Sequence, residues 1–475
     1  MNVKSSNTVY FIIANLLVFL IIVVNKNNGF FWDTIQLASG HGNFYYNDNF
    51  SKLILPTELD SGHIPAFGMY LALMWKIFGK SIQVSHLSML PFAFGIVWQL
   101  NILCRRFISE KYIGIALILI LIDASLMSQT TLVSPDVPLI FFFLLALNSV
   151  FNNRKALLVI SIFCLFLTSM RGMMLSICIL LLDIYVNYSF KKSITKCYIQ
   201  SLLKRSILYL PALLLFIAFS TYHYQQTGWI GYHKNSPWAD CFERVDWKGF
   251  VRNIFFLGWR LIDFGRIGVW IVFVLLFFKY KSLIFKDNKK HVLYFLFAVL
   301  LLLLPLNMLW ATNLMGHRYL IPIYLSFSFL SASILFSDYV NRPFRCMLII
   351  IWFVVSLSGN LWIYPDKISK GWDSTLAHLP YYNLRQAAIN YLDTNNVDFK
   401  DVDTFFPNYY SLDDIDFNND KRYFDNYIIE NNSEYIIYSN IFNVDDNVYD
   451  YMFNNYESIK RFEKNGVFIL IMKLK

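Results

Sequence analysis

Long apolar runs separated by short polar connections make up most of this chain. A helix needs roughly 20 mostly apolar residues to cross a bilayer, and runs of about this length recur as far as residue 363. The pattern predicts a mainly α, polytopic membrane protein with about eleven transmembrane helices. The expected spans are 8–24, 86–104, 112–128, 135–151, 156–170, 172–188, 206–222, 264–280, 291–310, 318–336 and 345–363.

A further apolar segment, 64–79, is shorter than these spans and contains Pro65 near its start. The basic residues between the apolar runs decide its place, because Lys and Arg gather in cytoplasmic loops. If 64–79 lies in the membrane interface, all the basic connections fall on the cytoplasmic side with the N-terminus. We therefore expect an interfacial helix in the first outer loop. The basic residues are Arg105, Arg106, Lys111, Arg154, Lys155, Lys191, Lys192, Lys196, Lys204, Arg205, Lys279, Lys281, Lys286, Lys289, Lys290, Arg342 and Arg345.

The same orientation defines the outer face. It receives the loop 25–85, the turn 134–136, the loop 223–263, the turn 316–318 and the segment after residue 364. We expect any chemistry on a lipid-borne substrate to use polar residues from these regions.

The segment 365–475 differs in character from the rest of the chain. It is rich in Asp, Asn and Tyr and has no apolar run long enough to cross a bilayer. Short apolar runs at 435–438 and 467–471 predict strands, and 384–392 predicts a helix. We expect two domains, a transmembrane catalytic domain at 1–364 and a small extracytoplasmic α/β domain at 365–475.

Composition supports the membrane assignment. The chain is 56% hydrophobic and 15% charged, whereas soluble domains carry about 25% charged residues. The net charge of +9 comes from the first 364 residues, since acidic residues outnumber basic ones after that point. The basic residues therefore serve membrane orientation rather than nucleic-acid binding. The cysteines show no disulfide framework and no metal-ligand spacing.

Acidic side chains gather in the stretch 30–67, on the expected outer face. Asp33 follows the first span, and Glu58 and Asp60 come shortly before His63. Two carboxylates at a membrane surface can divide the work of a transfer reaction, one taking a proton from the acceptor and the other orienting a substrate. Asp33, Asp60 and Glu58 are therefore the catalytic candidates. A helix-capping or interfacial role is the alternative for Asp33.

Further candidates stand at the expected outer ends of spans. Arg171 and Arg318 are cations near the membrane, where a charge is a functional hypothesis by default, and Arg can donate two hydrogen bonds to a phosphate. Snorkelling to the lipid headgroups is their alternative. Candidates for contact with phosphate or sugar are His63, Asp136 and His317. Capping of the helix after Asp136 and local hydrogen bonds of the histidines are the structural alternatives.

These motifs together resemble the GT-C superfamily of membrane glycosyltransferases, in particular the branch of protein O-mannosyltransferases and the aminoarabinose transferase of lipid A. The resemblance covers roughly residues 1–340. It rests on Asp33 after the first span and on the D-x-x-H-x-P pattern that starts at Asp60. Ser134-Pro135-Asp136, Thr168-Ser169-Met170-Arg171-Gly172 and Gly316-His317-Arg318-Tyr319 follow in register. Ile64 and Met173 replace prolines of the family pattern, which leaves the acceptor class open.

The resemblance implies an inverting hexosyl- or pentosyltransferase that takes a sugar from a polyprenyl-phosphate carrier. The acceptor is a lipid such as lipopolysaccharide, another glycan or a protein. A transporter or flippase for lipid-linked glycans is the alternative, as is a ligase that moves a whole glycan from a diphosphate carrier. Transporters usually hold their ionisable residues at the membrane midplane and often contain a repeat between halves. Neither feature is visible in this sequence, which favours the enzyme.

The expected partners are the lipid-linked donor, membrane lipids and the acceptor. No nucleic acid is expected. The sequence requires no cofactor and no metal, although Asp33, Asp60 and the histidines leave a metal site open. The Asn-, Lys- and Phe-rich composition suits an AT-rich bacterial genome. We therefore expect a multi-pass protein of the inner membrane with its active site and C-terminus in the periplasm; an endoplasmic-reticulum location is the alternative.

Overall fold

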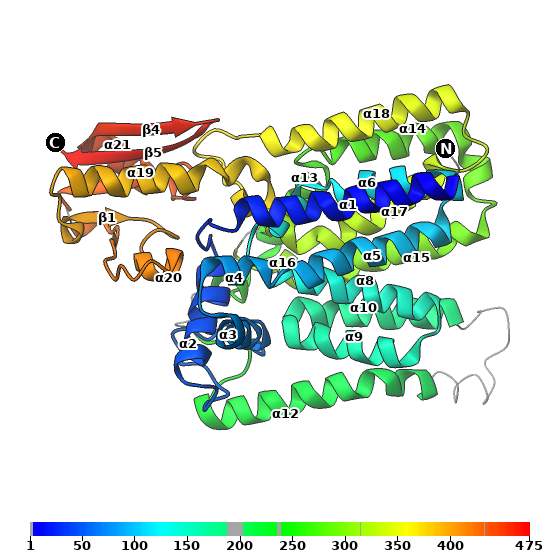
Figure 1. Cartoon of the computed structure of the whole chain (residues 1–475), viewed down its shortest axis with the longest axis horizontal. Helices are drawn as coiled ribbons and strands as arrows, with labels where there is room; N and C mark the ends of the chain where they lie inside the picture. Colours follow the sequence, from blue (N-terminus) through cyan, green and yellow to red (C-terminus); the bar gives the residue numbers. More distant parts are fainter. Residues whose placement is uncertain (1–2, 188–202, 235–238, 314, 432) are drawn as a thin grey trace.

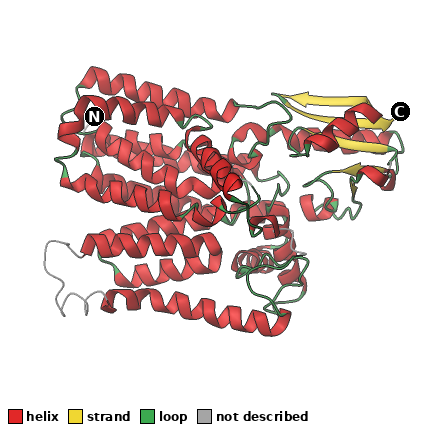
Figure 2. Cartoon of the chain, turned by 180° about the vertical axis from the view of Figure 1, so that it is seen from behind, coloured by secondary structure: helices red, strands yellow, loops and turns green. Residues whose placement is uncertain are grey.

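The computed structural model describes residues 3–187, 203–234, 239–313, 315–431 and 433–475. A bundle of helices forms most of the molecule, and a small domain with a β-sheet stands at one end of it (Figure 1, Figure 2). The N-terminus lies at the other end (Figure 1). This arrangement confirms the predicted mainly α architecture with a C-terminal α/β domain.

The bundle begins with the helices before residue 203. They are α1 (Val3–Asn25), the π-helix η1 (Ile35–Gly40), α2 (His41–Asn47), α3 (Ala66–Phe78), α4 (Ile82–Leu87), α5 (Leu90–Phe107), α6 (Ile113–Leu121), α7 (Ala124–Thr131), α8 (Asp136–Phe151), α9 (Lys155–Thr168) and α10 (Met170–Asn187). The later helices of the bundle are α12 (Leu210–Thr227), α13 (Trp247–Ile262), α14 (Ile267–Ile284), α15 (Asn288–Leu303), α16 (Leu306–Leu309), η5 (His317–Leu320), α17 (Ile321–Leu335) and α18 (Arg342–Ser358).

Several of these helices are suited to crossing a membrane. Within the described residues, eight are long and apolar enough, and nine spans result if the bent pair Glu110–Leu121 and Ala124–Thr131 counts as one. The remaining predicted spans correspond to α8 and α9, which have 16 and 14 residues. A helix of 14 residues rises about 21 Å, less than the ~30 Å hydrocarbon core. The total of about eleven spans therefore stays a prediction.

The segment expected in the membrane interface forms α3. Figure 1 shows α3 end-on, so its axis lies across the axes of the bundle helices. One face of α3 is buried through Leu71, Ala72 and Trp75, and the Trp75 indole donates a 2.8 Å hydrogen bond to Ser85 Oγ. This orientation agrees with an interfacial helix rather than a span.

The basic connections come together at the end of the bundle that holds the N-terminus. Asn7 donates to the carbonyl of Glu110 at 2.7 Å, and Ser109 donates to the carbonyl of Phe336 at 3.3 Å. Lys290 reaches Ser337 at 2.8 Å, and Arg345 donates to the carbonyl of Leu335 at 3.1 Å. The turns at 105–112, 287–290 and 335–345 thus share one end. Lys191, Lys192 and Lys196 lie outside the described residues.

The C-terminal domain is built on a five-stranded sheet with strand order β2-β1-β3-β5-β4. The strands are β1 (Val402–Thr404), β2 (Asp425–Asn426), β3 (Tyr435–Ser439), β4 (Tyr456–Lys464) and β5 (Val467–Leu474), and the helices are α19 (Pro380–Thr394), α20 (Leu412–Asp416) and α21 (Asp446–Asn455). β1 pairs in parallel with β2 and β3, whereas β5 pairs antiparallel with β3 and β4. The predicted strands at 435–438 and 467–471 and the helix at 384–392 are confirmed as β3, β5 and α19.

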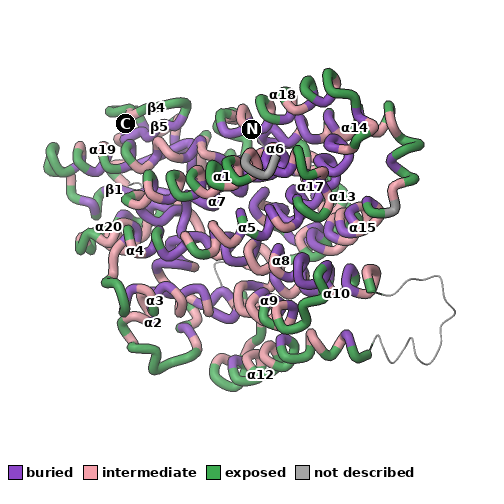
Figure 3. The backbone as a smooth tube through the Cα atoms, turned by 45° about the vertical axis from the view of Figure 1, so that its right-hand side comes forward, coloured by how far each residue is buried: buried purple, intermediate pink, exposed green. Residues whose placement is uncertain are grey.

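Two hydrophobic cores hold the described residues together. The bundle core surrounds α17, whose residues are all buried. The second core gathers residues between Trp372 and Met472, together with Phe31 and Leu132 from the bundle. Figure 3 shows exposed residues along the outside of the bundle, and many are apolar, such as Phe278 at 76% and Leu302 at 68%. An outer surface of this kind suits contact with lipid. The domain boundary at 364/365 stays a prediction.

The end of the bundle with the basic connections and the end with the C-terminal domain should lie on opposite sides of the membrane. In a bacterial inner membrane, a reporter that is active only in the periplasm should be active when fused after Lys475. The same reporter inserted at Asn153, an exposed turn beside Arg154, should be silent, because basic turns stay on the cytoplasmic side. Equal activity at both positions would contradict the orientation.

Candidate functional site

Arg318 is the centre of a buried ion cluster at the end of the bundle that faces the C-terminal domain. Its guanidinium forms an ion pair with Asp33 through Nη2. Nη1 lies 2.7 Å from a carboxylate oxygen of Asp373, and Nε lies 3.7 Å from Asp136. Arg318 itself is buried. Three carboxylates from distant parts of the sequence thus surround one guanidinium.

Arg171 is the second cation of the cluster and has fewer partners. It forms an ion pair with Asp136, and its guanidinium carbon lies 4.4 Å from the centre of the Tyr319 ring. Its side chain keeps 20% of its exposure, against 8% for Arg318. Arg171 is therefore the guanidinium with capacity left for a ligand.

Helix ends deliver these charges to one place. Asp136 is the first residue of α8, where the helix dipole favours a negative charge. Arg171 is the second residue of α10, and Arg318 stands in η5 immediately before α17. Gly172 explains the tight α9–α10 hairpin, since a Cβ at this position would come within 1.9 Å of the Leu165 carbonyl oxygen. The sequence around Arg171 thus allows the close approach that places it beside Asp136.

Asp33 follows a strained residue. Trp32 has a φ of 53°, a conformation that is unfavourable for a bulky side chain. The Trp32 ring packs edge-on against Phe406, at 5.5 Å between ring centres, and the Asp33 carbonyl accepts a 2.9 Å hydrogen bond from the Leu37 amide. Contacts with the C-terminal domain thus maintain the strained turn that presents Asp33, and strained residues often occur at functional sites.

A small polar pocket adjoins Arg171. It has a volume of about 40 Å³, and residues of the first outer loop and the α9–α10 hairpin line it, among them Leu37, His41, His63, Thr168 and Arg171. His63 Nδ1 is buried and has no hydrogen-bond partner among the described residues. Burial, assisted by the charge of Arg171, lowers the pKa of His63 to about 4. His63 is thus neutral at neutral pH and available for a hydrogen bond.

Asp60 and Glu58 lie apart from the ion cluster. Asp60 is buried, and one carboxylate oxygen lies 2.8 Å from His223 Nε2 while the other accepts a 2.7 Å hydrogen bond from the Gly62 amide. These contacts attach the first outer loop to the end of α12. Glu58 is exposed and forms no ion pair within the described part of the chain. The geometry gives Asp60 a positioning role; the assignment of Asp60 and Glu58 as catalytic residues stays a prediction.

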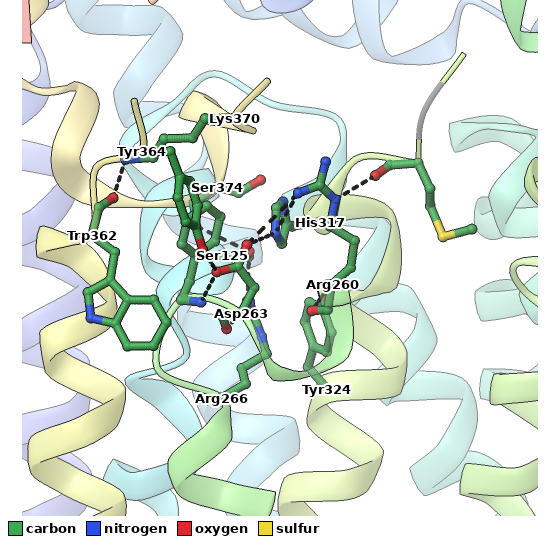
Figure 4. A network of polar contacts seen from close by, with 12 residues as sticks. Ser125, Arg260, Asp263, Arg266, His317, Tyr324, Trp362, Tyr364, Lys370 and Ser374 are labelled. Carbon is green, nitrogen blue, oxygen red and sulfur yellow. Dashed lines mark hydrogen bonds and ion pairs between the residues drawn. The ribbon is translucent and has the colours of Figure 1, made fainter. Parts of the chain in front are cut away.

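His317 belongs to a neighbouring polar network rather than to the cluster (Figure 4). Its Nε2 lies 2.7 Å from Asp263, which also accepts a hydrogen bond from the Tyr364 hydroxyl. Lys370 donates to the carbonyl of Trp362, and burial lowers the pKa of Lys370 to about 7. The network fixes the chain between α18 and Asp373 against η5.

Asp373 is the residue of the cluster that the sequence analysis missed. Its backbone carbonyl accepts hydrogen bonds from Ser128 Oγ at 2.8 Å and from Gln129 Nε2 at 2.7 Å. The carbonyl of the next residue, Ser374, accepts from Ser125 at 3.2 Å. Burial raises the pKa of Asp373; Arg318 opposes this shift, and the carboxylate of Asp33 adds to it. Ser125 and Ser128 inside the expected span 112–128, with Gln129 directly after it, were the available signal, since polar groups in a span need partners.

Within the ranges that the structure describes, no group of three or more His, Cys, Asp or Glu side chains is placed to hold a metal ion. The carboxylates of the cluster are instead directed to guanidinium groups.

Comparison with known proteins gives one structural similarity. No known family profile matches the sequence, and no curated protein matches it. Among solved structures, the chain is similar to the crystal structure of ArnT from Cupriavidus metallidurans bound to undecaprenyl phosphate. The superposition has a TM-score of 0.46 at 10% sequence identity and covers 82% of this chain and 72% of ArnT.

Loss of the Arg318 side chain should strongly destabilise the protein. Arg318→Ala should lower the free energy of unfolding by about 3–5 kcal/mol, because it leaves buried carboxylates without their cation. Arg461→Ala removes a half-exposed arginine paired with Glu463 and should change it by no more than about 1 kcal/mol. Chemical denaturation in detergent measures both values. Equal effects would show that the cluster does not depend on Arg318.

Proposed function

We propose that this chain is a membrane glycosyltransferase that moves a sugar from a polyprenyl-phosphate carrier to an acceptor at the membrane surface. The observation that carries the proposal is the joining of Asp33, Asp136, Arg171 and Arg318 beside a polar pocket at one end of the bundle. Each of these residues comes from one of the motifs that resemble the GT-C superfamily, and His63 of a further motif lines the pocket.

Arg171 is proposed to hold the phosphate of the donor. The leaving group of such a donor is a lipid phosphate, which is already a weak base and needs cationic stabilisation more than protonation. Arg171 is partly exposed and lines the pocket, whereas Arg318 is surrounded by carboxylates. The neutral imidazole of His63 can add a hydrogen bond to the same phosphate or to the sugar.

Asp33 is proposed to act as the general base. Its side chain keeps 21% of its exposure, whereas Asp136 is buried at 2%, so Asp33 is the more accessible of the two. Arg318 holds one of its oxygens and leaves the other free to accept a proton from the acceptor. Attack on the anomeric carbon from the side opposite the phosphate gives inversion of configuration.

The position of the charges favours this enzyme over a transporter. All members of the cluster stand at or before helix ends, whereas transporters usually hold ionisable groups and substrate near the bilayer midplane. A ligase that uses a diphosphate carrier remains the second candidate. We assign the cluster to the extracytoplasmic side, opposite the basic connections, and propose a bacterial inner membrane as its location.

The proposal is tested with purified protein and a panel of polyprenyl-phosphate hexoses and pentoses. Release of polyprenyl phosphate from at least one donor is the expected result. Release of polyprenyl diphosphate from a diphosphate-linked glycan alone would favour the ligase. Turnover of neither class, in protein that binds neither carrier, would contradict the proposal.

Replacement of Asp33 tests the general base. Asp33→Asn keeps the shape of the side chain but cannot accept a proton, so transfer should fall by at least about a hundredfold. Donor binding should change little. Single-turnover transfer and donor binding are measured on the same preparation, with Asp48→Asn in the same loop as the control. Near-normal transfer by Asp33→Asn would remove it as the base.

Replacement of Arg171 tests the phosphate site. Arg171→Ala should weaken donor binding, and Arg171→Lys should retain part of it, since Lys keeps the charge but lacks the planar fork. Arg342→Ala, an exposed arginine of the basic end, is the control. Unchanged donor affinity in folded Arg171→Ala would assign Arg171 to the lipid headgroups.

A further inference from the structure

The ion cluster contains more negative than positive charge. Asp33, Asp136 and Asp373 face Arg171 and Arg318, so the ionised cluster has one excess negative charge. Asp373 supplies this excess, and it comes from the segment that leads into the C-terminal domain. None of the sequence motifs that contain the other four residues includes Asp373.

Asp373 is held in place independently of its carboxylate. Ser128 and Gln129 of α7 hold its backbone carbonyl at 2.8 and 2.7 Å, and Ser128 also donates to the carbonyl of Thr375 at 3.1 Å. The side chain is then directed at Arg318, with one oxygen at 2.7 Å from Nη1. Ser374 Oγ also donates a hydrogen bond to the Asp373 carboxylate, at 3.1 Å.

We infer that Asp373 is a positioning residue that selects a neutral hydroxyl, rather than a phosphate, as the acceptor group. The inference rests on the proposed glycosyl transfer. A phosphate acceptor brings its own negative charge to a site that already has an excess, and like charges repel. A hydroxyl brings none, and Asp33 removes its proton during attack.

The transfer step needs only the donor, the acceptor hydroxyl and the side chains of the cluster. The acceptor oxygen forms a bond to the anomeric carbon as its proton passes to the Asp33 carboxylate. The bond between the anomeric carbon and the phosphate oxygen breaks, and its electron pair stays on the polyprenyl phosphate, beside Arg171. Asp373 takes no proton in this step and stays paired with Arg318.

Asp373 and Asp33 share the Arg318 guanidinium, so Arg318 has less positive charge left for a further anion in the site. The charged and titratable groups around Asp33 come from several elements. They are Arg318 and Tyr319 of η5, Asp136 of α8, Arg171 of α10, Asp373 of the C-terminal segment, and Tyr410 in the turn before α20.

The first test measures anion binding without turnover. Asp373→Asn removes one negative charge and keeps the shape of the side chain, so undecaprenyl phosphate should bind about tenfold more tightly or better. Asp366→Asn, an exposed carboxylate of the same segment, should bind it as the wild type does. Tryptophan fluorescence titration in detergent provides the affinities. Unchanged or weaker binding by Asp373→Asn would overturn the inference.

The second test compares transfer to a hydroxyl acceptor with transfer to a phosphate acceptor. Asp373→Asn should lower the preference for the hydroxyl by about tenfold, because it removes a charge that repels the phosphate. Asp373→Glu keeps the charge and should retain the wild-type preference, even where the rate is lower.

The outcomes separate the inference from the proposed function. A slower Asp373→Asn with an unchanged preference between the two acceptors would make Asp373 a purely structural residue. A wild type that transfers sugar to a phosphate acceptor as fast as to a hydroxyl would contradict the selection of the hydroxyl and leave glycosyl transfer intact. Failure of the wild type to bind undecaprenyl phosphate would contradict the proposed function and the role of Asp373 with it.

Discussion

A buried guanidinium must be paired, and in this chain the pairing of Arg318 determines how distant segments meet. Removing charges from water costs several kcal/mol per ion, and close partners must offset that loss. Arg318 obtains its partners from the turn after α1, from the start of α8 and from the first part of the C-terminal segment. The cluster therefore forms only when α1, α8, α17 and residues 372–374 are all in place. The hydrogen bonds from Ser128 and Gln129 of α7 to the Asp373 carbonyl hold one of these partners in place.

The two arginines of the cluster have different surroundings, and this difference organises the proposed chemistry. Arg318 is paired with several carboxylates and serves mainly to orient them. Arg171 has one carboxylate partner and also lines the pocket. The sequence alone treats both as phosphate-binding candidates. Their local sequences give no reason to separate them, because the number of partners depends on tertiary contacts.

Much of the fold follows from local patterns. The apolar runs mark the bundle helices, the basic connections mark one end of it, and period and composition identify α3, α19, β3 and β5. The edge strand β4 has a mostly exposed, polar sequence, so it gives no apolar signal. The bend between α6 and α7 falls at Asp123, whose side chain accepts hydrogen bonds from the Ser125 and Leu126 amides and so caps α7. The prediction of one span over 112–128 did not use this helix-start signal.

The members of the candidate site could be predicted only in part, for a physical reason. Four members stand next to helix ends: Asp33, Asp136, Arg171 and Arg318. A charged residue at such a position is easily distinguished from its apolar neighbours in the sequence. Asp373 stands among many other acidic residues, and nothing in its neighbourhood distinguishes it. The partner of Asp60, His223, lies 163 positions away, a pairing that local pattern cannot indicate.

The most direct test of the account is a structure of the chain with bound undecaprenyl phosphate, determined by cryo-electron microscopy in lipid nanodiscs. The account predicts the phosphate within hydrogen-bond reach of Arg171, about 3 Å, at the pocket lined by His63, with Arg318 still paired to Asp33 and Asp373. A phosphate bound at the basic end of the bundle would contradict it, as would one that displaces Asp33 from Arg318.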